Sequence, residues 1–307
     1  MNMKKFKKKL TLLSLVLMTT LSSSGSKGVI NERLPFDKNQ IRNEIDIEKD
    51  SYVIQGICVV DDYIFVSLYN DSISKSSKVF IYDLDMNFIK ECSLNNNSHV
   101  GGIAYDDINQ IVWITDIKGT VSGYNKDEFI VNDHINPKYY RLDVSNGLTN
   151  IYGNNSVAYI TYYDGYLFLG DYALETFSTL KKFKIQDNGS INPDDYEKIY
   201  FYGLVQGLSF FEHDGSTYML VSSSIGTNFK SNIKLVKYDP NIKDYRNEKC
   251  LNIEMPNMLE QIYMDKSNIL YSTFESNADK YKKSIKHSGD IIIEDLDEKI
   301  DDYIHKL

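Results

Sequence analysis

Acidic side chains and one histidine recur beside short apolar segments of the 307-residue chain. They are Asp116, Asp171, Glu260, Glu275 and His99. Carboxylates are the hard oxygen ligands that Ca²⁺ prefers, in sets of about six to eight oxygens. Two carboxylates in different environments, one protonated and one ionised, can instead act as acid and base in glycoside hydrolysis. These residue types therefore permit a calcium site or a hydrolytic site, provided that the fold brings them together.

Three uncharged polar residues occupy comparable positions in the sequence. Gln55 and Gln206 each precede a glycine and an apolar residue, and Ser223 ends another apolar segment. We predict that they bind a ligand, although glutamines beside a crowded backbone also serve to satisfy buried peptide groups. Glu275 is the sharpest catalytic candidate, because it follows an apolar segment at a place where it has no evident packing purpose.

A two-strand sequence phrase recurs five times from about residue 52 onward. Each copy has a short apolar segment, a turn rich in Asp, Asn or Gly, and a second apolar segment that ends in a small or acidic residue. The copies align at Ile57, Ile103, Ile160, Leu208 and Ile262, with offsets of 46, 57, 48 and 54 residues. A period near 50 residues built of strand pairs is typical of a β-propeller, whose blades are four-stranded antiparallel sheets.

Other strand-like segments provide the outer strands of these blades. The fifth copy lacks a convincing fourth strand, and the strand-like segment 41–49 precedes the first copy. We predict that 41–49 completes the fifth blade, which would also protect open sheet edges. The segments that complete the first, fourth and fifth copies are 78–84 and 87–94, 233–239 and 249–255, and 289–296.

The sequence thus predicts an all-β fold, a five-bladed β-propeller closed by an N-terminal strand. A six-bladed ring is the alternative, because the insert 132–154 could hide a degenerate pair of strands. A β-sandwich of unrelated hairpins is a second alternative, which the matched turns of the five copies disfavour. Helical periodicity is limited to a short turn around 297–307.

The antiparallel pairing of the first two strands in each blade places the start of the first beside the end of the second. Both points then face one mouth of the central channel, and a concave polar cluster of this kind hosts ligands. The residues collected there are Gln55, His99, Gln206 and Glu260 from strand starts, and Ser67, Asp116, Asp171, Ser223 and Glu275 from strand ends. Asp116 and Asp171 are the candidate metal ligands, with the alternative that they cap turns.

The first 25 residues have the pattern of a secretory signal peptide. A lysine-rich start precedes the apolar segment 10–21 and the small residues 22–25. A membrane anchor is the alternative, but about a dozen apolar residues are fewer than the roughly 20 that span a bilayer. We expect residues 1–25 to be cleaved, 26–50 to form a linker and closing strand, and 51–307 to form one propeller domain of a secreted protein.

Cleavage would change the formal net charge from −9 to −14, because five lysines and no acidic residue lie in the removed segment. An acidic surface disfavours nucleic acids and anionic lipids as partners. We therefore expect an extracellular small molecule, glycan or protein as the partner, and no membrane span in the mature form. Cys58, Cys92 and Cys250 are expected to be buried free thiols rather than a disulfide with one thiol left over.

At the repeated phrases the chain resembles a family of exported bacterial β-propeller proteins that mostly have no assigned activity. The motifs that carry the resemblance are Gln55-Gly56-Ile57, the segment 99–105, Gln206-Gly207-Leu208, and Met255-Pro256 followed by Phe274-Glu275-Ser276 and Tyr281. The third copy departs from the pattern, with Ala158-Tyr159 in place of Gln-Gly or Gly-Gly. A looser similarity to lactonase-like and other calcium-dependent propeller hydrolases lacks their diagnostic residues.

Two functions follow as hypotheses. The leading hypothesis is a secreted propeller that acts as a binding or scaffold module, with a ligand or Ca²⁺ in the channel mouth. The rival is an extracellular hydrolase of a glycan or lactone, which would use Glu260, Glu275 and His99 as catalytic residues.

Overall fold

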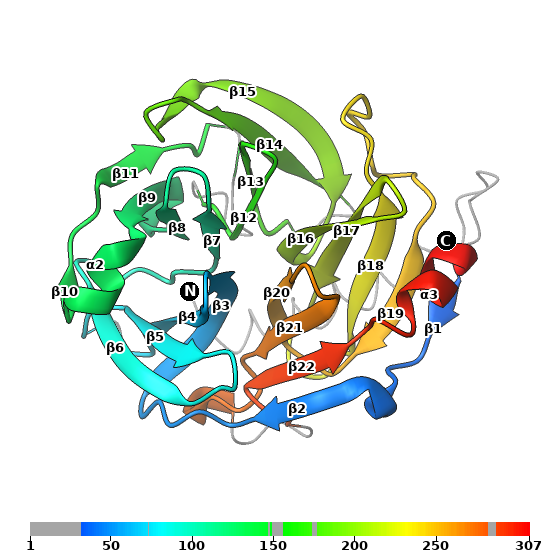
Figure 1. Cartoon of the computed structure of the whole chain (residues 1–307), viewed down its shortest axis with the longest axis horizontal. Coiled ribbons are helices and arrows are strands. Elements are labelled where there is room, and N and C mark those ends of the chain that lie inside the picture. The colour runs from blue at the N-terminus through cyan, green and yellow to red at the C-terminus, as the bar shows by residue number, and fades with distance from the viewer. Residues whose placement is uncertain (1–31, 73, 147, 149–155, 174–176, 282–286) are drawn as a thin grey trace, which may run out of the picture. The chain divides into compact units, whose positions relative to one another are not determined.

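The computed structural model describes residues 32–72, 74–146, 148, 156–173, 177–281 and 287–307, and the predicted signal peptide lies outside them. The described chain is a ring of five β-sheets (Figure 1). The five-bladed propeller predicted from the repeat is therefore confirmed. Its strands are rich in Ile, Val, Tyr and Phe, which suit the half-buried faces of a pleated sheet.

Blades 1 and 2 contain the first two sequence copies. Blade 1 consists of β3 (Tyr52–Val60), β4 (Tyr63–Asn70), β5 (Lys78–Asp83) and β6 (Phe88–Leu94), with β10 (His134–Ile135) parallel to β6 at the outer edge. Blade 2 consists of β7 (Ile103–Asp106), β8 (Ile111–Thr115), β9 (Thr120–Asn125) and β11 (Tyr139–Asp143); η2 (Ile117–Gly119) precedes β9, and α2 (Lys126–Val131) follows it. The described part of the insert 132–154 thus supplies outer strands to two blades, and a sixth blade is excluded there.

Blades 3 and 4 follow in the same direction around the ring. Blade 3 consists of β12 (Tyr159–Tyr163), β13 (Tyr166–Gly170), β14 (Phe177–Ile185) and β15 (Ile191–Tyr202). Blade 4 consists of β16 (Val205–His213), β17 (Ser216–Ser223), β18 (Ser231–Lys237) and β19 (Leu251–Met255), with β1 (Arg33–Leu34) parallel to β19.

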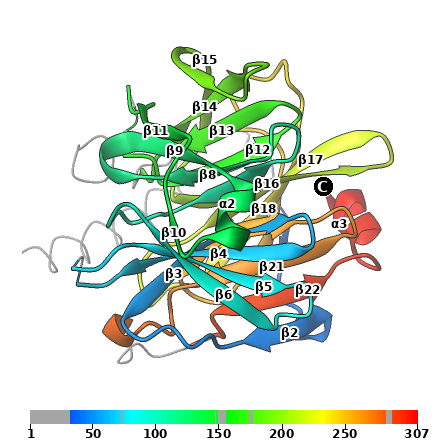
Figure 2. The ribbon, with the colours of Figure 1, turned by 60° about the vertical axis from the view of Figure 1, so that its left-hand side comes forward.

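Blade 5 combines strands from both ends of the described chain. Its strands are β20 (Leu259–Met264), β21 (Ile269–Phe274), β22 (Ile291–Asp295) and β2 (Ile41–Ile45). The N-terminal strand β2 pairs antiparallel with β22, as predicted, and Figure 2 shows the two strands side by side. Three short helices flank this sheet: η1 (Lys38–Gln40) leads into β2, η3 (Asp279–Tyr281) follows β21, and α3 (Ile300–Lys306) follows β22.

The hydrophobic core is divided into five clusters, and each lies between two neighbouring blades. Phe65 of blade 1 and Ile114 of blade 2 belong to one cluster, for example, and Trp113 of blade 2 and Phe183 of blade 3 belong to the next. Burial of apolar area at these contacts stabilises the ring by roughly 25 cal/mol per Å². The three cysteines are free and buried, as predicted. Burial raises the pKa of Cys92 to about 11, so this thiol is unreactive.

Hydroxyl groups on the second strand of one blade bind the backbone of the inner strand of the next blade, or the segment just before it. The bonds, each donated to a backbone carbonyl, are Ser67 to Val100 at 3.0 Å, Ser222 to Glu260 at 2.6 Å, and Thr273 to Gln55 at 2.7 Å. Ser67 also accepts a hydrogen bond from the amide of Gly56, so it is held in the framework of the channel.

Blade 3 departs from this arrangement, as its sequence does. Tyr159 of β12 pairs with Gly170 of β13, so the large residue is on the inner strand and the small one on the second strand. A Cβ atom at Gly170 would lie 2.1 Å from the Tyr159 hydroxyl oxygen. The tyrosine ring therefore fills the space that a side chain on the second strand would occupy.

No helix among the described residues combines the length and the apolarity that crossing a membrane requires. The predicted helical turn near the C-terminus is confirmed as α3, which packs on blades 4 and 5 through Ile300 and Tyr303. The Tyr303 hydroxyl donates a hydrogen bond to Gln40 Oε1 at 2.9 Å, and this bond links α3 to η1.

Candidate functional site

Two buried carboxylates meet their glutamine partners at one mouth of the channel. Gln206, at the start of β16, donates a hydrogen bond from Nε2 to Glu260 Oε1 at 3.3 Å. Gln55, on β3, donates from Nε2 to Glu275 Oε1 and to the carbonyl of Ile54. Blades 1, 4 and 5 therefore contribute to one group of side chains. We call Gln55, Gln206, Glu260, Glu275, His99, Tyr69, Lys280 and Tyr281 the mouth cluster.

Glu260 and Glu275 lie close enough to influence each other's charge. Glu260 is 7% exposed and Glu275 is 5% exposed. Burial raises the pKa of Glu260 well above its ordinary value, the negative charge of Glu275 raises it further, and Lys280 opposes the shift. A carboxyl group with a raised pKa is what the sequence-based hypothesis of a general acid requires of Glu260.

Lys280, in η3, supplies the positive charge of the mouth cluster. Its Nζ lies 3.7 Å from Glu275 Oε2 and donates a hydrogen bond to the Tyr69 hydroxyl. The same ammonium lies 4.9 Å from the centre of the Tyr69 ring and 4.7 Å from the centre of the Tyr281 ring. Burial and the charge of Glu275 raise the pKa of both tyrosines, so their phenol groups stay protonated.

His99, just before β7, stacks on Tyr69 with ring centroids 4.3 Å apart and an angle of 24° between the planes. Its side chain is exposed to solvent, yet the surrounding protein desolvates the ring and lowers its pKa, with Glu275 opposing the shift. The imidazole is therefore neutral at pH 7. It belongs to the mouth cluster through its stacking contact and its proximity to Glu275.

Polar groups with unused hydrogen-bonding capacity accompany the mouth cluster. Gln55 Oε1 and Ser223 Oγ are buried and make no hydrogen bond to any residue that the structure describes. The amide orientation of Gln55 follows from its two acceptors, which both require the NH₂ group. Tyr172 donates a hydrogen bond to the carbonyl of Ser224 at 2.8 Å and links blade 3 to blade 4 beside Ser223.

Asp116 and Asp171 bind to groups of their own blades. Asp116 caps η2 by accepting from the amide of Ile117 at 2.7 Å, and it also accepts from Ser122 Oγ at 3.0 Å. Asp171 accepts from the amide of Thr179 at 3.2 Å. These contacts agree with the alternative that both residues stabilise turns and strand ends, and their metal role stays a prediction.

Among the described residues, a different group of three metal-ligating side chains lies within reach of one ion. It consists of His213, Asp214 and Asp301, with His213 Nε2 2.6 Å from Asp301 Oδ1. His213 and Asp214 lie at the turn between β16 and β17, at the opposite end of β16 from Gln206. This group is therefore separate from the mouth cluster.

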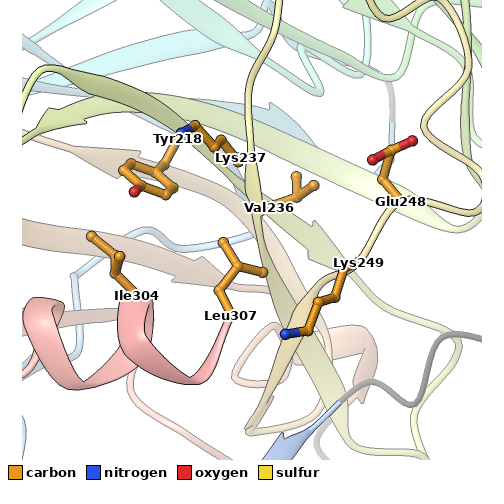
Figure 3. Close-up of a pocket in the computed structure, with 7 residues that line it drawn as sticks. All are labelled: Tyr218, Val236, Lys237, Glu248, Lys249, Ile304 and Leu307. Carbon is orange, nitrogen blue, oxygen red and sulfur yellow. The ribbon is translucent and has the colours of Figure 1, made fainter.

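The mouth cluster is also distinct from a cavity of about 290 Å³ between α3 and blade 4 (Figure 3). That cavity is bordered by Ile304 and Leu307 on one side and by Tyr218 and Lys237 on the other. Its lining contains one acidic side chain, Glu248.

Sequence reasoning missed Tyr69, Lys280 and Tyr172 as members or neighbours of the site. Tyr69 lies two residues after Ser67 and points to the same mouth, so the alternation of the strand could have indicated it. Lys280 lies in a turn beyond β21, where the sequence has no periodic pattern.

Comparisons with known proteins identify the fold alone. No family model matches the chain, and no curated protein matches it. The structure is similar to that of an α-L-arabinofuranosidase, CtGH43, from Clostridium thermocellum, with 10% sequence identity, coverage of 81% of this chain and 90% of that one, and a TM-score of 0.51.

Two further solved structures align with the chain. U3-55K has 9% identity and a TM-score of 0.49, with coverage of 85% of this chain and 99% of that one. The WD40 repeats of RRP9 have 10% identity and a TM-score of 0.46, with coverage of 84% and 98%. The chain is thus a β-propeller, and its membership of an exported bacterial family remains a prediction.

Proposed function

We propose that this propeller is a binding module that holds a small, hydrogen-bond-donating ligand, such as a glycan unit, in the mouth cluster. The main support for this proposal is the pair of buried carboxyl groups, Glu260 and Glu275. Each has a glutamine partner, and both lie where three blades meet. Burial of charged groups is costly, so a pair of this kind in a channel mouth is a strong candidate for function.

The hydrogen-bonding groups of the mouth cluster favour a ligand that donates hydrogen bonds. The Glu275 carboxylate is an acceptor, and Gln55 Oε1 is a buried acceptor without a hydrogen bond in the described chain. A hydroxyl-rich ligand would supply the missing donors, and the Tyr69–His99 stack offers a ring surface beside them.

Titration calorimetry with a panel of mono- and oligosaccharides tests this proposal. We expect binding by the parent protein and at least a tenfold loss in Glu275→Gln, which removes the charge but keeps the shape. Glu254→Gln is the matched control, because Glu254 pairs with Lys230 and lies on β19, which β17 and β18 separate from the inner strand β16. Absence of binding to every member of the panel would contradict the proposal.

Hydrolysis of a glycan or lactone is the second candidate function, favoured by a carboxyl group with a raised pKa. The raised pKa of Glu260 suits a proton donor to a leaving oxygen, and Glu275 with Lys280 beside it suits a charged partner. The structural neighbour described as an arabinofuranosidase has the same kind of fold and motivates a glycoside panel. Turnover by the parent that Glu275→Gln and Glu260→Gln abolish would establish hydrolysis in place of simple binding.

Calcium is an alternative occupant of the mouth, and export is part of the proposal. A Ca²⁺ titration that releases heat and raises the melting temperature, with both effects lost in Glu275→Gln, would support calcium; no heat and no stabilisation would exclude it.

N-terminal sequencing of protein recovered from a culture medium tests export, with a start at Ser26 expected from cleavage after Gly25.

A further inference from the structure

The mouth cluster contains an ammonium group of the chain itself. The Lys280 Nζ is held by the Glu275 carboxylate, the Tyr69 hydroxyl and the faces of the Tyr69 and Tyr281 rings. A cation beside a carboxylate and against two aromatic faces is the usual environment in which proteins recognise amines. The contacts of Lys280 therefore indicate that the space between Glu275 and the two tyrosine rings accepts an ammonium group.

Glu275 is the acid of the mouth cluster that pairs with an ammonium group, since its Oε2 lies 3.7 Å from Lys280 Nζ. Glu260 holds its proton more strongly than an ordinary glutamate, because burial and the charge of Glu275 raise its pKa, and the neutral His99 adds no charge. Glu260 has an uncharged partner in Gln206. A ligand ammonium would therefore compete with Lys280 for the Glu275 carboxylate, in a buried setting where ion pairing is strong.

The attachment of Lys280 allows it to move aside. Its residue is in the three-residue helix η3, whose turn is held by backbone bonds from the Ala278 amide to Glu275 and from the Tyr281 amide to Ala278. The side chain is 23% exposed, and a lysine stem is long and flexible. The ammonium can leave the cage by rotation of the side chain, with the backbone of η3 in place.

We propose that the ligand of the mouth cluster is an amino sugar, whose primary ammonium group takes the place of the Lys280 ammonium between Glu275 and the rings of Tyr69 and Tyr281. The hydroxyl groups of the sugar then face the unused capacity of Gln55 Oε1 and Ser223 Oγ. This inference rests on the proposed binding function and names its ligand class. Lys280 acts in it as an internal competitor for the site.

Titration calorimetry at pH 7 with glucosamine, glucose and N-acetylglucosamine tests the inference. The three sugars share a ring, but only glucosamine has an ammonium group. We expect glucosamine to bind at least tenfold more tightly than the two neutral sugars. Lys280→Met, which keeps the apolar stem and removes the competing charge, should tighten glucosamine binding about tenfold, and Glu275→Gln should weaken it by a similar factor.

Lys230→Met is the matched control, since Lys230 pairs with Glu254 on blade 4; it should leave all three affinities unchanged. Circular dichroism and thermal melting confirm that the variants are folded. Equal affinity for glucose and glucosamine would overturn the inference and leave the binding function intact. Weaker glucosamine binding in Lys280→Met would also overturn it, because Lys280 would then be a contact of the ligand. Failure of all three sugars and of the wider saccharide panel would overturn the binding function itself.

Discussion

Gln261, on the inner strand β20, connects two blades that are not neighbours. Its Oε1 accepts from the amide of Ile103 at 2.9 Å, and its Nε2 donates to the carbonyl of Ile103 at 2.6 Å, so blade 5 is tied to blade 2. Blade 1 lies between them, and a Cβ atom at Gly56 would be 2.6 Å from Gln261 Oε1. Gly56 therefore leaves the space through which this side chain crosses the centre of the ring.

Replacement of this glutamine should be costly. In Gln261→Met the amide and carbonyl of Ile103 lose their partners while buried, at about 1–3 kcal/mol each. We expect the free energy of unfolding to fall by about 2–6 kcal/mol in urea titrations. Gln186→Met, at an exposed turn, should change it by less than about 0.5 kcal/mol. A loss as small as the control would contradict the role of Gln261 at the channel centre.

For single residues, the sequence predicts the place in the fold better than the hydrogen-bond partners. The alignment of strand starts and ends placed Gln55, Gln206, Glu260 and Glu275 at one mouth, because antiparallel pairing follows from the repeat. The amide of Gln261 could not be recognised, since its bonds join residues 158 positions apart and leave no local pattern. The catalytic or binding roles of the site residues depend on contacts between distant parts of the chain and on burial, so these roles stay predictions.

In blade 3 the large residue, Tyr159, is on the inner strand β12, and the small residue, Gly170, is its partner on the second strand β13. Gly170→Ala would place a methyl group against the buried ring of Tyr159, and overpacking of this kind costs roughly 1–3 kcal/mol. We expect a loss of that size in thermal or chemical unfolding. In a Tyr159→Leu background the same change should cost less, because the ring has gone. Equal costs in both backgrounds would show that the two residues are not coupled.

The closing strand pair of blade 5 contains a buried acid with an unusual proton affinity. Glu294 on β22 is opposite Ile41 of β2, and burial, assisted by the charge of Asp37, raises its pKa to about 8. The folded state thus holds a proton that the unfolded state releases at its ordinary pKa of 4.5. Stability from this group is present below pH 4.5 and is lost as the pH rises towards 8.

Glu294→Gln should remove this pH dependence, because the amide keeps the shape of the protonated acid. We expect the variant to be more stable than the parent above pH 8 by on the order of 2–4 kcal/mol, and the difference to vanish near pH 4.5. Unfolding titrations in urea across this range provide the measurement. The exposed Glu298→Gln serves as the control, and parallel pH profiles of parent and Glu294→Gln would refute the expectation.

The elements themselves could be predicted from the sequence to a large extent. The five strand pairs and the closing strand follow from alternating apolar residues and turn-forming residues. The two-residue strands β1 and β10 could not be predicted, because their pairing with β19 and β6 depends on the tertiary fold and not on a local pattern.

At the scale of the whole molecule, the ring is held closed by segments from both ends of the described chain. A chain that begins at Ile47 would lack β1, η1 and β2, and it would expose the edges of β22 and β19. We expect its melting temperature to fall by on the order of 10 °C relative to a chain that begins at Asn31. Scanning calorimetry makes the comparison, and equal melting temperatures would mean that the closing strand is dispensable.

The division of the core into five shared clusters governs how the molecule comes apart on heating. Each blade contributes one face to the cluster before it and the other face to the cluster after it. An open array of repeats can fray from an end repeat that has only one neighbour. A circular array has no end repeat, so the unfolding of any one blade exposes the apolar faces of its two neighbours. We therefore expect the five blades to unfold together in one cooperative transition.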